Sequence, residues 1–150
     1  MPDSREARRP RFLLALLGAA LVGAAGCDSG PKVYPVKGRV VNKGKGDVKD
    51  LAGYNVQFQS ASDPAETPGG AIEEDGTFVL YTYTRVGGKV VPGVKEGTYR
   101  ACVVPPAVEG RAPPPPVIPR KYTKFETSGL EYTITAGPND ITIEIDRDAR

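Results

Sequence analysis

The sequence contains no histidine and no tryptophan. Without an imidazole, the chain lacks the side chain that most often serves as a general base near neutral pH, and it lacks the partner for Ser-His or Cys-His nucleophile pairs. The usual zinc sites are excluded for the same reason. The absence of tryptophan weakens the case for an aromatic platform that binds carbohydrate. These absences favour a binding or structural protein over an enzyme, and no cofactor is expected.

Cysteine is scarce as well, because the chain has two, Cys27 and Cys102. Cys102 falls within an alternating stretch, on the face opposite Tyr99 and Ala101 and next to Arg100 in the sequence. A reactive thiol needs a partner that lowers its pKa, and no histidine is available for that role. We therefore interpret Cys102 as structural, with a catalytic thiol as the less favoured alternative.

No apolar run reaches the roughly 20 residues that a membrane-spanning helix needs. The longest uncharged apolar run is residues 12–25, which follows four arginines and ends in Ala24-Ala25-Gly26. The arginines favour the cytoplasmic side of a membrane, since positive charge crosses poorly. A basic flank, a short apolar run and small residues are typical of an export signal. We predict a signal segment over residues 1–26.

A cysteine, Cys27, follows the small residues directly. This order resembles the bacterial lipobox, in which the cysteine sulfur takes a diacylglyceryl group before cleavage. The usual pattern has leucine three residues before the cysteine, whereas this chain has Ala24 there and Leu21 further upstream. The resemblance implies lipidation of Cys27 and a place on the exported side of a bacterial membrane, anchored to its lipid. The alternatives are a plain secretory signal with a coincidental cysteine, or a short membrane anchor.

Residues 27–150 suffice for one domain and not for two. Basic and acidic residues balance in this part, because residues 1–26 hold four arginines against two acids. A neutral domain without a basic block gives no electrostatic reason to expect nucleic acid. We expect a polar tether over residues 27–32, a folded domain over residues 33–147, and a monomer.

The folded part alternates apolar and polar residues with period two, which is typical of half-buried strands. Alternation runs through residues 33–41, 54–59, 77–83, 98–104, 130–135 and 141–146, with a short edge strand at 71–72. About seven strands with Gly/Pro turns predict an all-β, antiparallel β-sandwich. We expect the last two strands to form a hairpin across residues 137–140. The predicted core comprises Val56, Phe58, Phe78, Leu80, Ile134 and Ile143.

Two groups of side chains outside the core are candidates for binding. Glu73, Glu74 and Asp75 could ligate calcium, but they lack the spaced acidic residues of a calcium-binding loop. The pair Asp75-Gly76 is more typical of a tight turn. Tyr81, Tyr83 and Tyr122 could form an aromatic binding strip, or they could pack at the rim of a sheet. An enzyme that uses loop carboxylates is the remaining alternative.

The longest irregular stretch, residues 105–121, is rich in proline. Four consecutive prolines cannot donate ladder hydrogen bonds and form a stiff extended segment. A stiff loop loses little entropy when it binds. The candidate partner contacts are therefore Pro113, Pro114, Pro115, Pro116 and Val117. The favoured interpretation of the proline run is a stiff crossover between the two sheets. We expect the following Ile118 and Tyr122 to be partly buried.

Several segments together resemble a known family. They are VKGRVV at residue 36, YNVQFQS at 54, EEDGTFVL at 73, EGTYRACVV at 96, IPRKY at 118 and TSGLEYTITAGPNDITIEI at 127. The chain resembles small planctomycete-type bacterial lipoproteins with a carboxypeptidase regulatory-like domain. That resemblance implies a transthyretin-like (prealbumin-like) sandwich that is non-catalytic. The expected function is a membrane-anchored cell-envelope module for an envelope protein or polysaccharide; a calcium-dependent or carbohydrate-binding module is the alternative.

Overall fold

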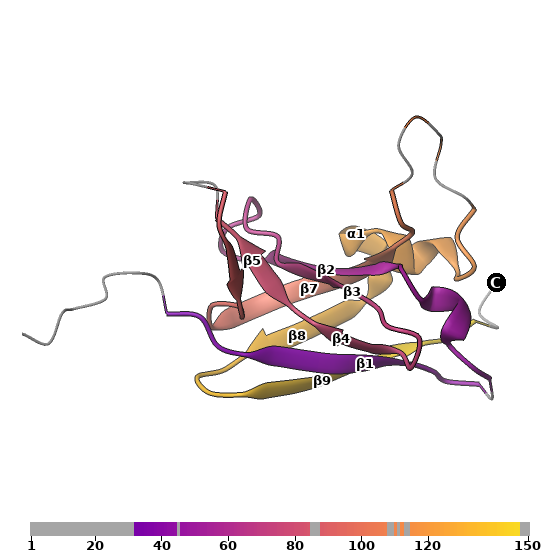
Figure 1. Ribbon diagram of the computed structural model, residues 1–150, viewed down its shortest axis with the longest axis horizontal. Coiled ribbons are helices and arrows are strands. Elements are labelled where there is room, and N and C mark those ends of the chain that lie inside the picture. Colours follow the sequence, from indigo (N-terminus) through magenta and orange to yellow (C-terminus); the bar gives the residue numbers. More distant parts are fainter. Residues whose placement is uncertain are drawn as a thin grey trace, which may run out of the picture.

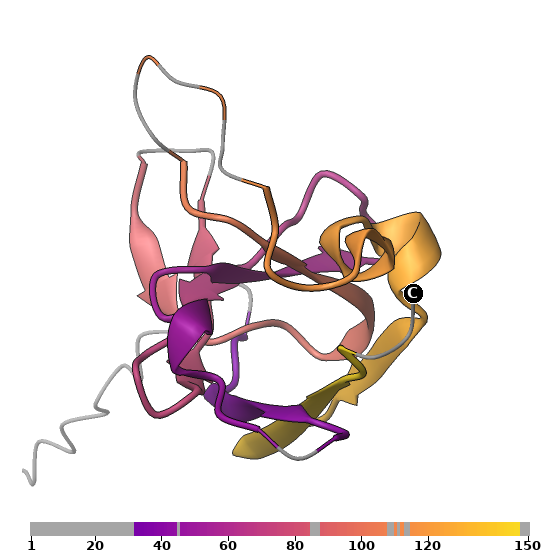
Figure 2. The same ribbon diagram turned by 90° about the vertical axis from the view of Figure 1, so that its right-hand side faces the viewer.

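The computed structural model describes residues 32–44, 46–84, 88–107, 110, 112 and 115–147. These residues form two β-sheets packed face to face (Figures 1 and 2). The strands are β1 (Val36–Asn42), β2 (Asn55–Ser60), β3 (Gly69–Ala71), β4 (Thr77–Val79), β5 (Tyr81–Tyr83), β6 (Val90–Pro92), β7 (Gly97–Val104), β8 (Leu130–Ile134) and β9 (Asn139–Ile145). Three short helical segments are η1 (Lys49–Leu51), η2 (Arg120–Thr123) and α1 (Phe125–Ser128).

The smaller sheet has the strand order β4-β1-β9, and the larger one has the order β6-β5-β3-β2-β7-β8. The all-β sandwich that the sequence predicts is therefore confirmed. One pairing departs from the antiparallel expectation, because β1 and β9 run parallel from Val36 opposite Asn139 to Asn42 opposite Ile145. The described chain has nine strands rather than about seven, because the predicted strand at residues 77–83 is divided in two and β6 is added.

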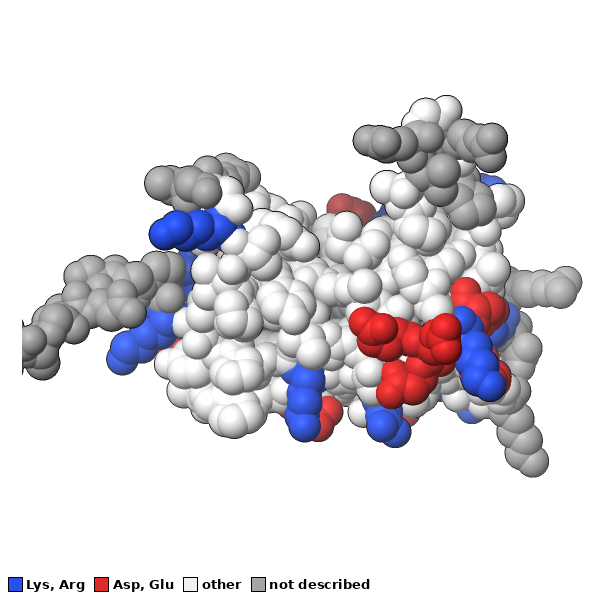
Figure 3. Space-filling model, in the orientation of Figure 1, with Lys and Arg blue, Asp and Glu red and all other residues white. Residues whose placement is uncertain are grey.

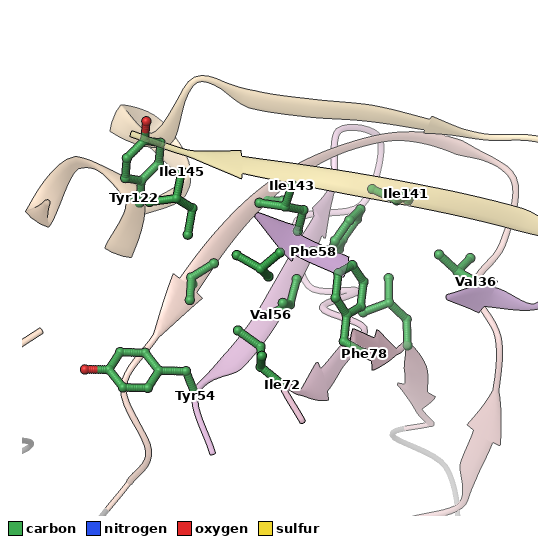
Figure 4. Packing of buried hydrophobic residues seen from close by; sticks show 14 of the residues in the cluster. Val36, Tyr54, Val56, Phe58, Ile72, Phe78, Tyr122, Ile141, Ile143 and Ile145 are labelled. Atoms are coloured by element: carbon green, nitrogen blue, oxygen red, sulfur yellow. The ribbon is translucent and has the colours of Figure 1, made fainter. Parts of the chain in front are cut away.

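The core lies between the two sheets, where the alternating apolar faces meet (Figure 4). All six predicted core residues are buried, none of them more than 1% exposed. Phe58 packs against the rings of Tyr99 and Tyr132, with centroid distances of 6.2 and 5.7 Å. Burial of one apolar face per strand is the main driving force for this arrangement.

The predicted strand at residues 77–83 crosses from one sheet to the other at Leu80. The Leu80 amide donates to the Val36 carbonyl in the smaller sheet, at 2.9 Å. The Leu80 carbonyl accepts from the Gly93 amide, next to the larger sheet, at 3.0 Å. Gly70 of β3 lies so close to the Val79 carbonyl that a Cβ at this position would collide with it. The prediction of an edge strand at residues 71–72 is wrong, because β3 lies inside the larger sheet, between β5 and β2.

The predicted C-terminal hairpin is also wrong. β8 pairs with β7 in the larger sheet, while β9 pairs with β1 in the smaller one. Asn139 stabilises the crossing between them, since its side chain accepts from the Thr135 amide at 3.0 Å and donates to the Thr135 carbonyl at 3.0 Å. An alternating pattern shows which face of a strand is buried, but it does not show which strand is the neighbour.

Residues 115–129 close one end of the sandwich and cover part of the outer face of β7 (Figure 2). Ile118 and Tyr122 are 4% and 5% exposed, so their predicted partial burial is confirmed and exceeded. The Tyr122 hydroxyl accepts from the Asp146 amide at 3.0 Å, and the Tyr54 hydroxyl accepts from the Val117 amide at 3.2 Å. These contacts tie the segment after the proline run to both sheets.

Candidate functional site

The acidic turn between β3 and β4 is built from its own hydrogen bonds. The Asp75 carboxylate accepts from the Thr77 hydroxyl at 2.6 Å and from the Thr77 amide at 2.9 Å. The hydroxyl bond, followed by the amide bond, holds the pKa of Asp75 below its ordinary value of 3.8. Gly76 follows with a positive φ of 81°, where Val40 and Val48 leave no room for a Cβ. The arrangement is the tight turn that the sequence predicts.

No group of three or more metal-ligating side chains converges within the part of the chain that the structure describes. Glu73 and Glu74 are exposed beside the turn, and the nearest carboxylate, Asp75, is already bonded to Thr77. The turn leads into β4, which pairs with β1. The hydrogen bonds of Asp75 to Thr77 are those of a turn, and they give no support to the calcium alternative.

Cys102 lies on the outer face of β7, where it was predicted, but this face is covered there. The thiol is buried at 2% exposure, beneath the segment that contains α1. Burial, and secondarily the negative charge of Glu126, raises the pKa of the Cys102 thiol to about 12. A thiol that stays protonated and out of solvent is a poor nucleophile, which agrees with the structural interpretation.

The three tyrosines of the expected aromatic strip are not brought together. Tyr122 is buried at the closed end of the sandwich, whereas Tyr81 and Tyr83 point outward from β5 at 38% and 64% exposure. Their neighbours across β6 share this face, because Tyr81 is opposite Pro92 and Tyr83 is opposite Val90. The two tyrosines therefore belong to a different surface from the one that the sequence suggests.

We call this surface the apolar strip, and it comprises Val79, Tyr81, Tyr83, Val90 and Pro92. Five large apolar side chains are exposed among the described residues, and four of them belong to the strip: Val79, Tyr81, Tyr83 and Val90. Isolated exposed apolar side chains are ordinary, but a contiguous group marks an interaction surface. Figure 3 shows an uncharged area over this part of the molecule, with acidic side chains gathered toward the opposite end of the same face.

Sequence reasoning singled out Tyr81 and Tyr83 but missed that the outward face of residues 77–83 is apolar from Val79 onward. Phe78 and Leu80 were recognised as the inward face of this stretch, but Val79, Tyr81 and Tyr83 on the other face are apolar too. A strand with both faces apolar is typical of a sheet that is covered on both sides. Here the outer face is open.

A groove of about 430 Å³ adjoins the strip where β4 lies beside β1. Its polar lining includes Lys37, Arg39, Glu73 and Thr77, and Val79 and Tyr81 connect it to the strip. Lys37 pairs with Asp140 at 3.7 Å, and both side chains are about 70% exposed. Such solvated ion pairs contribute little energy and leave their charges available. The groove is partly open to solvent, with both charges of this pair at its lining.

The proline-rich candidate site is described only in part. Pro113 and Pro114 lie outside the described residues. Pro115 is exposed, Pro116 is half-buried, and Val117 is 48% exposed although its amide is bonded to Tyr54. Cys27 also lies outside the described residues. Across the described chain, no helix has the length and apolarity to span a bilayer.

No family model matches this sequence. No curated protein matches it either. Among solved structures it is similar to the crystal structure of a DUF3823 family protein from Parabacteroides merdae. The TM-score is 0.41 with 15% identity, and the match covers 79% of this chain and 48% of that one. The chain thus spans about half the length of this neighbour, which is too distant to assign a family or an activity.

Proposed function

We propose that this chain is a bacterial lipoprotein, held on the exported side of a membrane by acylated Cys27, with a β-sandwich that serves as a non-catalytic binding or structural module. One observation carries the proposal: a basic flank, a short apolar run, small residues and Cys27 follow one another directly ahead of a folded domain. The few residues between Cys27 and Lys32 would keep the domain close to the lipid.

The chemistry of the domain supports the non-catalytic part of the proposal. Two side chains that were considered as site residues have structural contacts instead: Cys102 is buried with a raised pKa, and Asp75 is bonded to Thr77. The remaining distinctive features are surfaces, namely the apolar strip, the groove and the exposed Val117. Surfaces of this kind are the means by which a module recognises another molecule.

We further propose that an envelope protein or polysaccharide contacts the segment from Pro113 to Val117. Val117 offers an exposed apolar side chain, while its amide is held by Tyr54. A segment whose backbone is already held loses less conformational entropy when a partner binds. The buried Ile118 directly after it anchors the segment to the core.

The test is incorporation of a labelled fatty acid in a bacterial host, followed by membrane fractionation. Wild-type protein should be labelled and should sediment with membranes. Cys27→Ser should lose the label and either leave the membrane fraction or remain unprocessed. Cys102→Ser is the matched control, because it removes the other thiol of the chain and should be labelled like wild type. Normal processing and membrane association of Cys27→Ser would contradict the proposal.

A further inference from the structure

The tether and the apolar strip lie at the same end of the sandwich. Tyr34, two residues after the first described residue, forms an antiparallel bridge with Val94. The Tyr34 amide donates to the Val94 carbonyl at 2.7 Å, and the Val94 amide donates back at 2.9 Å. β6, which ends at Pro92, is separated from Val94 by Gly93 alone. The chain thus enters the domain beside the β5–β6 hairpin, as Figures 1 and 2 both show.

Gly93 makes this close approach possible. Its φ is 112°, and a Cβ there would come within 2.6 Å of the Tyr34 carbonyl oxygen. Its own carbonyl accepts from the buried Thr82 hydroxyl at 2.8 Å, and Thr82 lies between the two outward tyrosines of β5. The place where the tether enters is therefore fixed to the same backbone that presents Tyr81 and Tyr83.

The length of chain ahead of this point limits how far the strip can lie from the anchor. Tyr34 comes seven positions after Cys27, and a fully extended chain over seven positions spans at most about 24 Å. This reach is less than the thickness of a bilayer, about 40 Å with its headgroups. A domain on so short a tether stays at the lipid surface, with the hairpin at the end that faces the lipid.

We propose that the apolar strip is a membrane-contact face, and that Tyr83 and Val90, the pair next to the turn of the β5–β6 hairpin, enter the interfacial layer of the bilayer that carries the Cys27 anchor. This inference rests on the lipid anchor proposed above. Tyrosine suits the boundary between headgroups and acyl chains, because its ring is apolar and its hydroxyl stays hydrated. The strip itself carries no charged side chain, and the exposed Lys89 beside Val90 suits a surface of anionic headgroups.

This contact would orient the domain. Val117 is hydrogen-bonded to Tyr54, which directly precedes β2, whereas the tether enters beside β6 at the other end of the molecule (Figure 1). With the β5–β6 hairpin on the lipid, the proline-rich segment and the acidic end of the domain point away from the membrane. A single point of attachment would leave all orientations open, and a second contact removes most of them.

The absence of tryptophan from the chain supplies a direct test. Single variants Tyr83→Trp and Val90→Trp place one fluorophore on the strip, and Val117→Trp places one at the far end as the matched control. Each full-length acylated protein is reconstituted into phosphatidylcholine–phosphatidylglycerol vesicles with or without bromine on the acyl chains. Vesicle flotation reports anchoring, and bromine quenching reports contact with lipid. Circular dichroism checks that each variant is folded.

We expect bromolipids to reduce the Trp fluorescence roughly twofold at positions 83 and 90, and the emission maximum there to shift to shorter wavelength. Neither change should occur at position 117. Protein that floats with unquenched Trp at both strip positions would overturn the membrane-contact face and leave the anchor standing. Equal quenching at position 117 would also overturn it. Shielding from a water-soluble quencher without bromine quenching would assign the strip to a second copy or another partner instead. Failure of wild-type protein to float would overturn both proposals.

Discussion

Replacement of Phe58 by alanine tests the register of the sandwich. Phe58 of β2 is fully buried in the core (Figure 4). Its ring contacts the rings of Tyr99 and Tyr132. Phenylalanine-to-alanine changes at such sites cost about 3–5 kcal/mol, which combines lost transfer energy with a residual cavity. The two ring contacts account for roughly 0.5–1.5 kcal/mol each. In a domain of this size each kcal/mol lowers Tm by about 4 °C, so Phe58→Ala should lower Tm by about 15 °C.

Two further variants make the test sharper. Phe58→Leu keeps most of the volume and loses the ring contacts, so we expect a cost of about 1–2 kcal/mol. Gln57→Ala alters the adjacent residue, which points to the outer face opposite Cys102, and should cost less than about 1 kcal/mol. Urea and thermal unfolding, followed by circular dichroism in a Cys27→Ser background, measure all three. Similar losses for Phe58→Ala and Gln57→Ala would refute the register, since a slip by one residue exchanges the two faces.

Three other predictions concern the sheet junction, the thiol and the acidic turn. Gly70→Ala should cost about 1–3 kcal/mol in urea unfolding, because its methyl would collide with the neighbouring strand, whereas exposed Ala71→Ser should be nearly silent; equal effects would contradict the close approach. Cys102, the one thiol left in a Cys27→Ser background, should react with a maleimide only after unfolding, and fast labelling of native protein would contradict its burial. Asp75→Ala should lower Tm at pH 7, with a deficit that shrinks as the pH falls below 3.8, because the depressed pKa of Asp75 stabilises the fold only while the carboxylate is ionised; a deficit independent of pH would contradict this account.

The two ends of the domain differ in what they offer. One end holds the entry of the tether beside the β5–β6 hairpin, and the other holds the closing segment with Ile118, Tyr122 and the exposed Val117. A module fixed to a membrane needs one side for the lipid and another for its partner. The proposed orientation separates these tasks and predicts that variants at Val117 alter partner binding without altering the contact with lipid.

Neither the proposed lipid contact nor the proposed partner contact uses the groove beside β4. It is lined by cationic, acidic and aromatic side chains, and an exposed ion pair joins Lys37 and Asp140 of this lining at 3.7 Å. Such a mixture accommodates polar ligands without selecting one of them. If the apolar strip lies on the bilayer, the groove opens close to the lipid surface, because Val79 and Tyr81 belong to both.

Residue pattern alone was sufficient for the fold class and for the core. Every predicted core residue is buried because alternation in a half-buried strand reflects burial directly, and this relation is local. Residues 96–99 (EGTY) also resemble a tyrosine corner, a local motif in which the tyrosine hydroxyl bonds back to nearby backbone. In the structure the Tyr99 hydroxyl donates to the Lys95 carbonyl at 3.1 Å. The Asp75-Gly76 turn was also predictable, since its hydrogen bonds span two residues.

Strand partners could not be read in this way, because pairing depends on contacts between segments far apart in the sequence. The residues from Leu130 to Ile145 alternate as a hairpin would, yet β8 and β9 join different sheets. The candidate sites differ in the same way. Cys27 was identified from a pattern of consecutive residues. The apolar strip depends on the pairing of Tyr83 with Val90, which only the structure shows.

The sequence by itself determined that this chain forms an all-β domain of alternating strands, and it predicted an export signal over residues 1–26, directly ahead of Cys27. Both are properties of contiguous residues. Tertiary structure decided that the chain crosses between sheets at Leu80, that Cys102 is covered, and that the tether enters beside the exposed tyrosines. The physical reason is that these outcomes depend on which distant segments exclude water from one another, and a residue's neighbours along the chain do not specify that.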